Sequence, residues 1–292
     1  MRHHKQQGSN YGCSQICVRL DRIQFRAHLF LVKLLLLAGF VRMRDHFVMS
    51  QTWIVTYRRV VTYRHPRTRT TVAIQYSPAC TWLWPFKVTG IPDDQVGFCR
   101  DELERIFGAF RRNQLLTAEL ALDFSSHSGV DRDFILRHGI FGKSLPVGNR
   151  IGDELRYGSR YSVTMVRAYQ KPEIRSYRVE VELRKPWLHR QGIQKLTDLQ
   201  KLHGLLVPSR IRFVSIDWHA LARQLSRKGV APDPIMKEAQ RRAHSIHRAL
   251  HYVRSKGGIT NAYRLLVPLP INRKIQSALI TWAHLWSQAG EK

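Results

Sequence analysis

Hydrophobic and polar residues alternate through the middle of the chain in a pattern that predicts β-strands. Residues 53–63 and 71–76 are rich in β-branched and aromatic side chains, and a basic turn around Pro66 lies between them. This arrangement predicts a β-hairpin whose tip carries Arg64, Arg67 and Arg69. The same period of two recurs downstream and predicts four more strands, at 116–124, 154–157, 162–170 and 177–184.

A period of about 3.6 residues marks the intervening segments as helices. Asp93 or Asp94 can cap a helix with an apolar stripe from Val96 to Phe110, and a shorter helix is expected at 130–137. The element order predicts an α+β fold: a mostly antiparallel sheet with helices packed on one face. Beyond residue 190 we expect a mainly helical basic region, with a strand at 211–216 and helices at 218–228, 235–255 and 272–287.

The N-terminal part contains an apolar run at 29–40. Lys33 interrupts the run, no A-x-A-like cleavage site follows it, and it is too short to span a bilayer. We therefore expect a helix packed on the main domain rather than a signal or an anchor, although a start at Met43 or Met49 is an alternative. The length predicts about two domains, and we divide the chain into an uncertain basic N-terminal extension, a central domain and an accessory region, at 1–50, 51–190 and 191–292.

Charge is the unusual part of the composition. The chain has 48 Lys+Arg against 21 Asp+Glu, a net charge of +27, and the excess is spread as +6, +9 and +12 over residues 1–50, 51–192 and 193–292. This balance favours a polyanion, most simply nucleic acid, and an anionic membrane surface is the competing interpretation. The sequence contains no P-loop, so it does not support an ATP-driven motor. Four cysteines are too few for a disulfide framework, so we expect reduced thiols and a cytoplasmic location.

Two predicted strands each carry two carboxylates on one face. Glu119 and Asp123 lie four residues apart and therefore share a face, and Glu180 and Glu182 share a face of the last strand, flanked by arginines. Carboxylates gathered in this way repel unless a cation lies among them, and their oxygens suit Mg²⁺ or Mn²⁺. The alternative is that these acids only form salt bridges with the abundant arginines.

Tyr169 lies between two cations on one face of its predicted strand, Arg167 and Lys171. A free tyrosine has a pKa of about 10 and is a poor nucleophile at neutral pH. Cationic neighbours would favour the phenolate and would also neutralise a phosphate brought to it. Tyrosine, metal-binding acids and basic side chains are together what an attack on a DNA phosphodiester needs. The alternative is ordinary cross-strand packing of the ring.

The stretches TAELALDF, GSRYSVTMVRAYQK and YRVEVELR together resemble the replication initiation factor family, the rolling-circle initiators of plasmids and filamentous phages. The family pattern is an acid-rich strand, a Y-x-G-x-R-x-S segment, eleven residues from that glycine to the tyrosine of R-x-Y-x-K, and an R-V-E-x-E-L-K strand. Gly158 and Tyr169 keep the spacing. Two positions depart from the pattern: Glu119 stands where the family usually has Asp, and the tyrosine before the glycine comes one place later, as Tyr157.

The resemblance implies a nicking domain with Tyr169 as the nucleophile and Arg167 and Lys171 beside it. It also implies Glu119, Asp123 and Glu180 as candidate metal ligands, and Glu182, which shares a strand face with Glu180, is a further candidate. Contacts to DNA would come from Arg160, Ser162 and the arginines of the hairpin tip, Arg64, Arg67 and Arg69.

We therefore expect a rolling-circle replication initiator that nicks and rejoins one DNA strand through a covalent 5′-phosphotyrosine, assisted by Mg²⁺ or Mn²⁺. The alternative is a non-catalytic origin-binding or regulatory protein on the same fold. The expected partner is DNA, single-stranded or as an extruded origin hairpin; a host helicase and a second copy of the chain are further candidates, and no membrane is expected. His244, His247 and His251, at helical spacing, predict a half-exposed basic face rather than a metal site.

Overall fold

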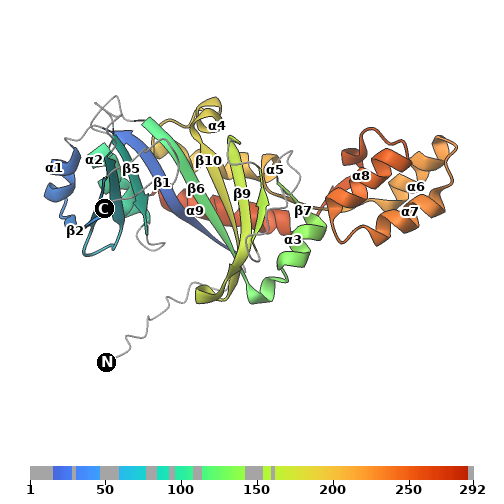
Figure 1. Cartoon of the computed structure of the whole chain (residues 1–292), viewed down its shortest axis with the longest axis horizontal. Coiled ribbons are helices and arrows are strands. Elements are labelled where there is room, and N and C mark those ends of the chain that lie inside the picture. Colours follow the sequence, from blue (N-terminus) through green and yellow to red (C-terminus); the bar gives the residue numbers. More distant parts are fainter. Residues whose placement is uncertain are drawn as a thin grey trace.

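A nine-stranded antiparallel sheet forms the body of the protein (Figure 1). The computed structural model describes residues 16–27, 31–46, 59–76, 84–91, 96–107, 114–141, 154–158 and 162–288. The strand order is β2-β3-β4-β5-β1-β6-β10-β9-β8. The strands are β1 (Ile16–Ala27), β2 (Val41–His46), β3 (Arg59–Arg64), β4 (Thr71–Tyr76), β5 (Trp84–Thr89), β6 (Gln114–Ser125), β8 (Leu155–Tyr157), β9 (Thr164–Lys171) and β10 (Ser176–Arg184).

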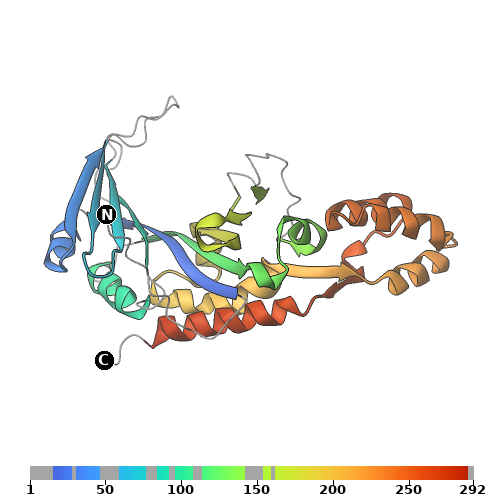
Figure 2. The same cartoon turned by 90° about the horizontal axis from the view of Figure 1, so that it is seen from below.

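Helices cover one face of this sheet, which confirms the predicted α+β class. Figure 2 shows α9 lying lengthwise along the sheet beside α5. Core residues of the strands and of these helices form one hydrophobic cluster, in which Trp282 and Trp286 of α9 pack on the apolar side of β1. The helices of this body are α1 (Leu31–Leu37), α2 (Val96–Phe107), α3 (Arg132–His138), α4 (Lys185–Arg190), α5 (Leu202–Ser209) and α9 (Ile271–Ser287).

The predicted helix in the apolar run is present as α1. Leu35 is fully buried in the main core, whereas Leu36 and Leu37 are exposed. Within the described part of the chain, no helix combines the length and apolar character needed to cross a membrane. The helix predicted to start near Asp93 is α2, and its proposed cap lies outside the described residues.

Strand β1 is the main element that the sequence pattern did not predict. It lies in the middle of the sheet, between β5 and β6. Its core positions, among them Val18, Leu20 and Ile23, are buried, and its other positions are polar. The predicted boundary at residue 50 therefore does not coincide with any division of the sheet, and the region treated as an extension supplies a central strand.

A β-bulge in β1 turns two consecutive charged residues toward one face. Leu20 pairs with Leu120 and Arg22 pairs with Glu119, so Asp21 is the extra residue. A bulge of this kind shifts the alternation of side chains by one position. Asp21 and Arg22 therefore both lie on the polar face, and the core alternation resumes at Ile23.

A smaller helical unit is inserted between two paired strands, β11 (Arg212–Ile216) and β12 (Leu266–Pro268). Strand β11 also pairs with β7 (Gly139–Ile140), which gives a three-stranded sheet. The unit consists of α6 (Trp218–Arg227), α7 (Pro232–Arg241) and α8 (Ile246–Lys256), and it has its own hydrophobic cluster. Figure 1 shows it at the opposite end of the molecule from α1. The predicted accessory region is therefore divided, since α5 and α9 belong to the core of the large sheet.

The single helix predicted at 235–255 is wrong, because the chain turns at residues 242–245. The turn brings Ile246 and Leu250 of α8 into one hydrophobic cluster with Leu221 of α6, which one straight helix would prevent. The predicted exposed histidine face is also wrong. His244 lies in the turn, and His247 is buried with its ring 6.4 Å from that of Tyr157.

Candidate active site

Charged side chains from four adjacent strands, β1, β6, β10 and β9, meet on the polar face of the sheet. In the register of the strands, Arg178 lies between Asp123 and Tyr169, and Glu180 lies between Ala121 and Arg167. The methyl side chain of Ala121 leaves room beside Glu180. This group, called the polar cluster below, consists of Arg19, Asp21, Arg22, Glu119, Asp123, Arg167, Tyr169, Arg178, Glu180 and Glu182.

Tyr169 is hydrogen-bonded to a carboxylate, because its hydroxyl donates to Oε1 of Glu180. Burial raises the pKa of Tyr169, and this hydrogen bond raises it further, while Arg178 and Arg167 only partly oppose the rise. Arg178 and Arg167 act in the predicted direction, toward the phenolate, but burial and the hydrogen bond to Glu180 outweigh them and keep the proton on Tyr169.

Arg167 joins two carboxylates of the cluster. Its Nη2 donates to Oε1 of Glu119 and lies 2.6 Å from Oε2 of Glu180. Arg22 of β1 contacts the other oxygen of Glu119. Glu119 is 1% exposed, and burial raises its pKa to about 7, although Arg22 and Arg167 act to lower it. The nearby Glu180 adds to the rise, which is the behaviour of two close carboxylates that compete for one proton.

Asp123 is held by arginines. Arg178 binds it in bidentate geometry, with Nε 2.6 Å from Oδ1 and Nη2 2.7 Å from Oδ2, and both residues are buried. Arg19 adds a contact of 2.9 Å. The predicted ligand Glu182 is also paired with two arginines, Arg184 at 2.8 Å and Arg22 at 3.5 Å. For these two acids the salt-bridge interpretation describes the observed contacts.

Asp21, Glu119 and Glu180 form a group of carboxylates suited to a metal ion. One oxygen from each lies within 4.8 Å of the other two. Oε2 of Glu119 and Oε2 of Glu180 are buried and accept no aligned hydrogen bond, although an arginine lies within ion-pair distance of each. Three carboxylates, two of which have a buried oxygen without an aligned hydrogen bond, fit a hard divalent cation such as Mg²⁺ or Mn²⁺.

Sequence reasoning missed Asp21 because the N-terminal region was treated as an extension. The available signal was the alternation in CVRLDRIQF, which predicts a half-buried strand. It also missed Lys87 of β5, which is half-buried. Burial lowers the pKa of its ammonium group, the nearby charge of Arg22 lowers it further, and Glu119 opposes this change.

The predicted DNA contacts lie in different places. Ser162 is half-buried near the tight turn at Gly158, where φ is +90° and an added Cβ would lie 2.9 Å from the carbonyl oxygen of Thr164. Lys171, predicted as a catalytic cation beside Tyr169, ends β9, is half-buried and does not belong to the polar cluster. Arg160 lies outside the described residues. The hairpin tip is not brought into the polar cluster, since β4 and β5 separate β3 from β1; its arginines are Arg64, Arg67 and Arg69.

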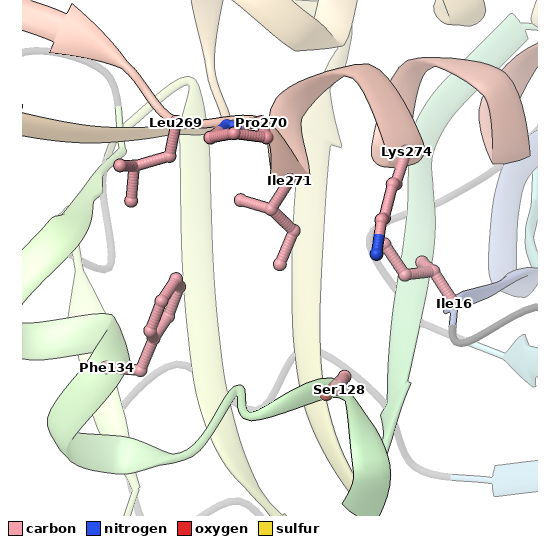
Figure 3. A pocket seen from close by; sticks show the side chains of 7 residues that line it. All are labelled: Ile16, Ser128, Phe134, Leu269, Pro270, Ile271 and Lys274. Atoms are coloured by element: carbon pink, nitrogen blue, oxygen red, sulfur yellow. The ribbon is translucent and has the colours of Figure 1, made fainter.

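A cavity of about 280 Å³ lies at the start of α9, on the apolar side of the sheet (Figure 3). Its walls are mainly aliphatic and aromatic, and Lys274 points toward it from α9 (Figure 3). No carboxylate lines it. It is lined by Ile16, Ser128, Phe134, Leu269, Pro270, Ile271 and Lys274. Its chemistry is unrelated to that of the polar cluster.

No protein-family model matches the chain, and no curated protein matches it significantly. Among solved structures, the chain is similar to the rolling circle replication initiator protein from Geobacillus stearothermophilus. The two share 16% sequence identity over 68% of this chain and 87% of that chain, with a TM-score of 0.40. Similarity at this level does not show the function of the chain, which depends on the chemistry of the polar cluster.

Proposed function

We propose that this chain is a rolling-circle replication initiator that nicks one DNA strand and rejoins it through Tyr169. The observation that carries the proposal is the hydrogen bond from the Tyr169 hydroxyl to Glu180, within a group of carboxylates and arginines on the polar face of the sheet. A nucleophile, a base in contact with it and cations for the phosphate are what phosphodiester transfer requires.

In the nicking step, Oε1 of Glu180 takes the proton of Tyr169 as the phenol oxygen bonds to phosphorus. The bond from phosphorus to the 3′ oxygen breaks, the leaving 3′ oxygen takes a proton from water, and the strand remains attached as a 5′-phosphotyrosine. In rejoining, a 3′ hydroxyl loses its proton to water as it attacks that phosphorus, the bond from phosphorus to the phenol oxygen breaks, and the proton on Glu180 passes to the departing phenolate. Arg167, whose side chain is 26% exposed, is placed to neutralise the phosphate.

Asp21, Glu119 and Glu180 would hold the divalent cation. A bound cation supplies Lewis-acid polarisation of a non-bridging phosphate oxygen. Glu180 can serve both roles because its two oxygens face different partners: Oε1 accepts from Tyr169 and Oε2 lies toward Arg167. Glu119 must lose its proton before it can act as a ligand.

A nicking assay tests the proposal. We expect the purified chain, with Mg²⁺ or Mn²⁺, to convert a supercoiled plasmid carrying the DNA that flanks its coding sequence into relaxed circles and a detergent-stable protein–DNA complex. Empty vector is the control. If the plasmid is bound but neither relaxed nor attached under any divalent condition, the nicking function is excluded.

The alternative, a non-catalytic origin-binding or regulatory protein, has one observation in its favour. The carboxylates of the polar cluster are already paired with arginines, and the raised pKa of Tyr169 opposes its ionisation. Specific DNA retention without any strand cleavage is the result that this alternative predicts, so the same assay separates the two.

Metal affinity should depend on pH through Glu119. Its pKa of about 7 means that the carboxyl is largely protonated at pH 6 and ionised at pH 8, so Mn²⁺ binding should strengthen over this range and release a proton. Glu119→Gln should weaken binding and flatten the pH dependence. Titration calorimetry in two buffers of different ionisation enthalpy, repeated across this pH range, measures the Mn²⁺ affinity and the number of protons released. An unchanged pH profile in Glu119→Gln would show that another group titrates; Glu154→Gln, a matched change outside the three ligands, is the control.

A further inference from the structure

The helical unit α6–α8 has a core of its own and is linked to the sheet by a two-stranded ribbon, and it also contacts the main body where α8 meets α3 and His247 meets Tyr157. Strands β11 and β12 pair through Val214↔Pro268, Ser215↔Val267 and Ile216↔Leu266, and the amide of Asp217 donates to the carbonyl of Leu265 at 2.7 Å. Its core is made of its own residues and a few neighbours. It contributes no residue to the polar cluster, so it serves a purpose other than the chemistry at Tyr169.

The surface of this unit is strongly basic. Residues 217–256 contain nine Lys and Arg but three Asp and Glu. Two of the acids are already engaged: Asp217 caps α6 by accepting from the amide of Ala220, and Glu238 is held by Arg241 and Arg242 at 2.7 and 2.6 Å. All nine basic side chains are exposed: Arg223, Arg227, Lys228, Lys237, Arg241, Arg242, Arg248, Arg254 and Lys256.

No large apolar side chain of this unit is more than partly exposed. Residues 217–256 are all described, and none is an exposed large hydrophobic residue. A helix that binds a membrane surface needs an exposed apolar face, and protein interfaces are usually anchored by buried aromatic or aliphatic groups. Single-strand binding uses exposed aromatic rings, whereas Tyr252 is half-buried, with the guanidinium of Arg242 4.6 Å from its ring centre. The regular phosphates of duplex DNA are the polyanion that this surface fits best.

Helices α7 and α8 are joined by four residues, 242–245, as in helix-turn-helix units. Ile246, Leu250 and Val253 of α8 face the core of the unit. The opposite face of α8 presents Arg248, His251 and Ser255, at helical spacing i, i+3 and i+7, all exposed. The ring of His244 lies 3.2 Å from Arg248 and connects the turn to this face.

We propose that the unit binds duplex DNA, with the exposed face of α8 in the major groove and the α7–α8 turn on the phosphate backbone. A major groove about 12 Å wide admits one helix. Arg248 and His251 would reach base edges, and Arg241 and Arg242 would contact phosphates. This binding does not depend on the nicking function. If both the nicking function and this proposal are correct, the helical unit binds the double-stranded flank while the sheet binds the unpaired strand.

The test is fluorescence anisotropy of the full chain, without divalent ions, on a random duplex of about 20 base pairs and on a single strand of the same length. The test variant is Arg241→Gln/Arg248→Gln. The control, Arg227→Gln/Lys228→Gln, removes the same charge from the opposite end of the bundle, at the α6–α7 connection. All four residues are exposed, so both variants should fold normally, which circular dichroism checks.

We expect the turn variant to lose about tenfold or more in duplex affinity. Its log–log salt slope between 50 and 200 mM NaCl should be shallower by about 0.9, from the lost phosphate contact of Arg241. The control should lose less than about threefold, and single-strand affinity should change little in both. Equal losses in the two variants, no loss in either, or stronger binding to phosphatidylserine vesicles than to the duplex would overturn the proposal. The Tyr169→Phe variant should bind the duplex normally, so a failure of nicking leaves this result interpretable.

Discussion

Tyr169→Phe is expected to abolish covalent attachment of the protein to DNA while leaving DNA binding within about twofold of the wild type. The change removes only the hydroxyl, so no oxygen remains to bond to phosphorus. Loss of an essential nucleophile lowers a rate by on the order of 10⁴-fold or more, which puts the product below detection. The ring keeps its place on β9, and Glu180 keeps its contact with Arg167.

The measurement is transfer of radiolabel from the scissile phosphate of a DNA substrate to protein on a denaturing gel, with duplex and single-strand affinities in parallel. Tyr157→Phe is the matched control. Tyr157 is 2% exposed, its ring packs 4.6 Å from that of Phe141, and its hydroxyl has no hydrogen-bond partner among the described residues. Loss of that hydroxyl should therefore affect neither chemistry nor stability appreciably.

Label transfer by Tyr169→Phe at the wild-type level would remove Tyr169 as the nucleophile and make Tyr161 the next candidate. The Glu180→Gln variant tests whether Glu180 is the base that takes the proton of Tyr169. If Glu180 is the base, this variant should keep DNA binding and lose most of the nicking rate, because an amide cannot take the phenol proton. Normal nicking by Glu180→Gln would reassign the base.

Local patterns predicted the strands that carry the candidate chemistry. The alternation in TAELALDF placed Glu119 and Asp123 on one face of their strand, and the alternation in YRVEVELR did the same for Glu180 and Glu182. In the structure both pairs lie on the polar face of the sheet. Period two is a local property of the chain, so it is readable without the fold. Whether Tyr169 and the four acids act as proposed stays a prediction.

Non-local features were not predictable in the same way. Asp21 joins Glu119 and Glu180 only because β1 pairs with β6, about a hundred residues away, and because a bulge turns Asp21 to the polar face. The raised pKa of Tyr169 follows from burial and from the hydrogen bond to Glu180 on the neighbouring strand. The break between α7 and α8 has no glycine or proline to signal it, since core packing of the unit decides where the chain turns.

Arg178→Met is expected to destabilise the protein by about 3–5 kcal/mol, because it leaves Asp123 buried and without its bidentate partner. The loss of positive charge also exposes Glu180, 3.5 Å from Arg178, to repulsion from its neighbours. Urea unfolding at pH 7.5 measures the change. Arg184→Met is the control: the pair of Arg184 with Glu182 is partly exposed, so its loss should cost less than about 1 kcal/mol.

The double variant Arg178→Met/Asp123→Leu decides what Asp123 does. If Asp123 is only the counter-ion of Arg178, replacing both by apolar groups should restore most of the stability, since the buried charge and its desolvation cost are removed together. Mn²⁺ binding should then be kept or strengthened, because a cation beside Asp21, Glu119 and Glu180 is gone. Loss of Mn²⁺ binding in a stable double variant would show that Asp123 is a metal ligand after all, as the family resemblance implies. The salt bridge to Arg178 would then be a contact that the bound ion must break.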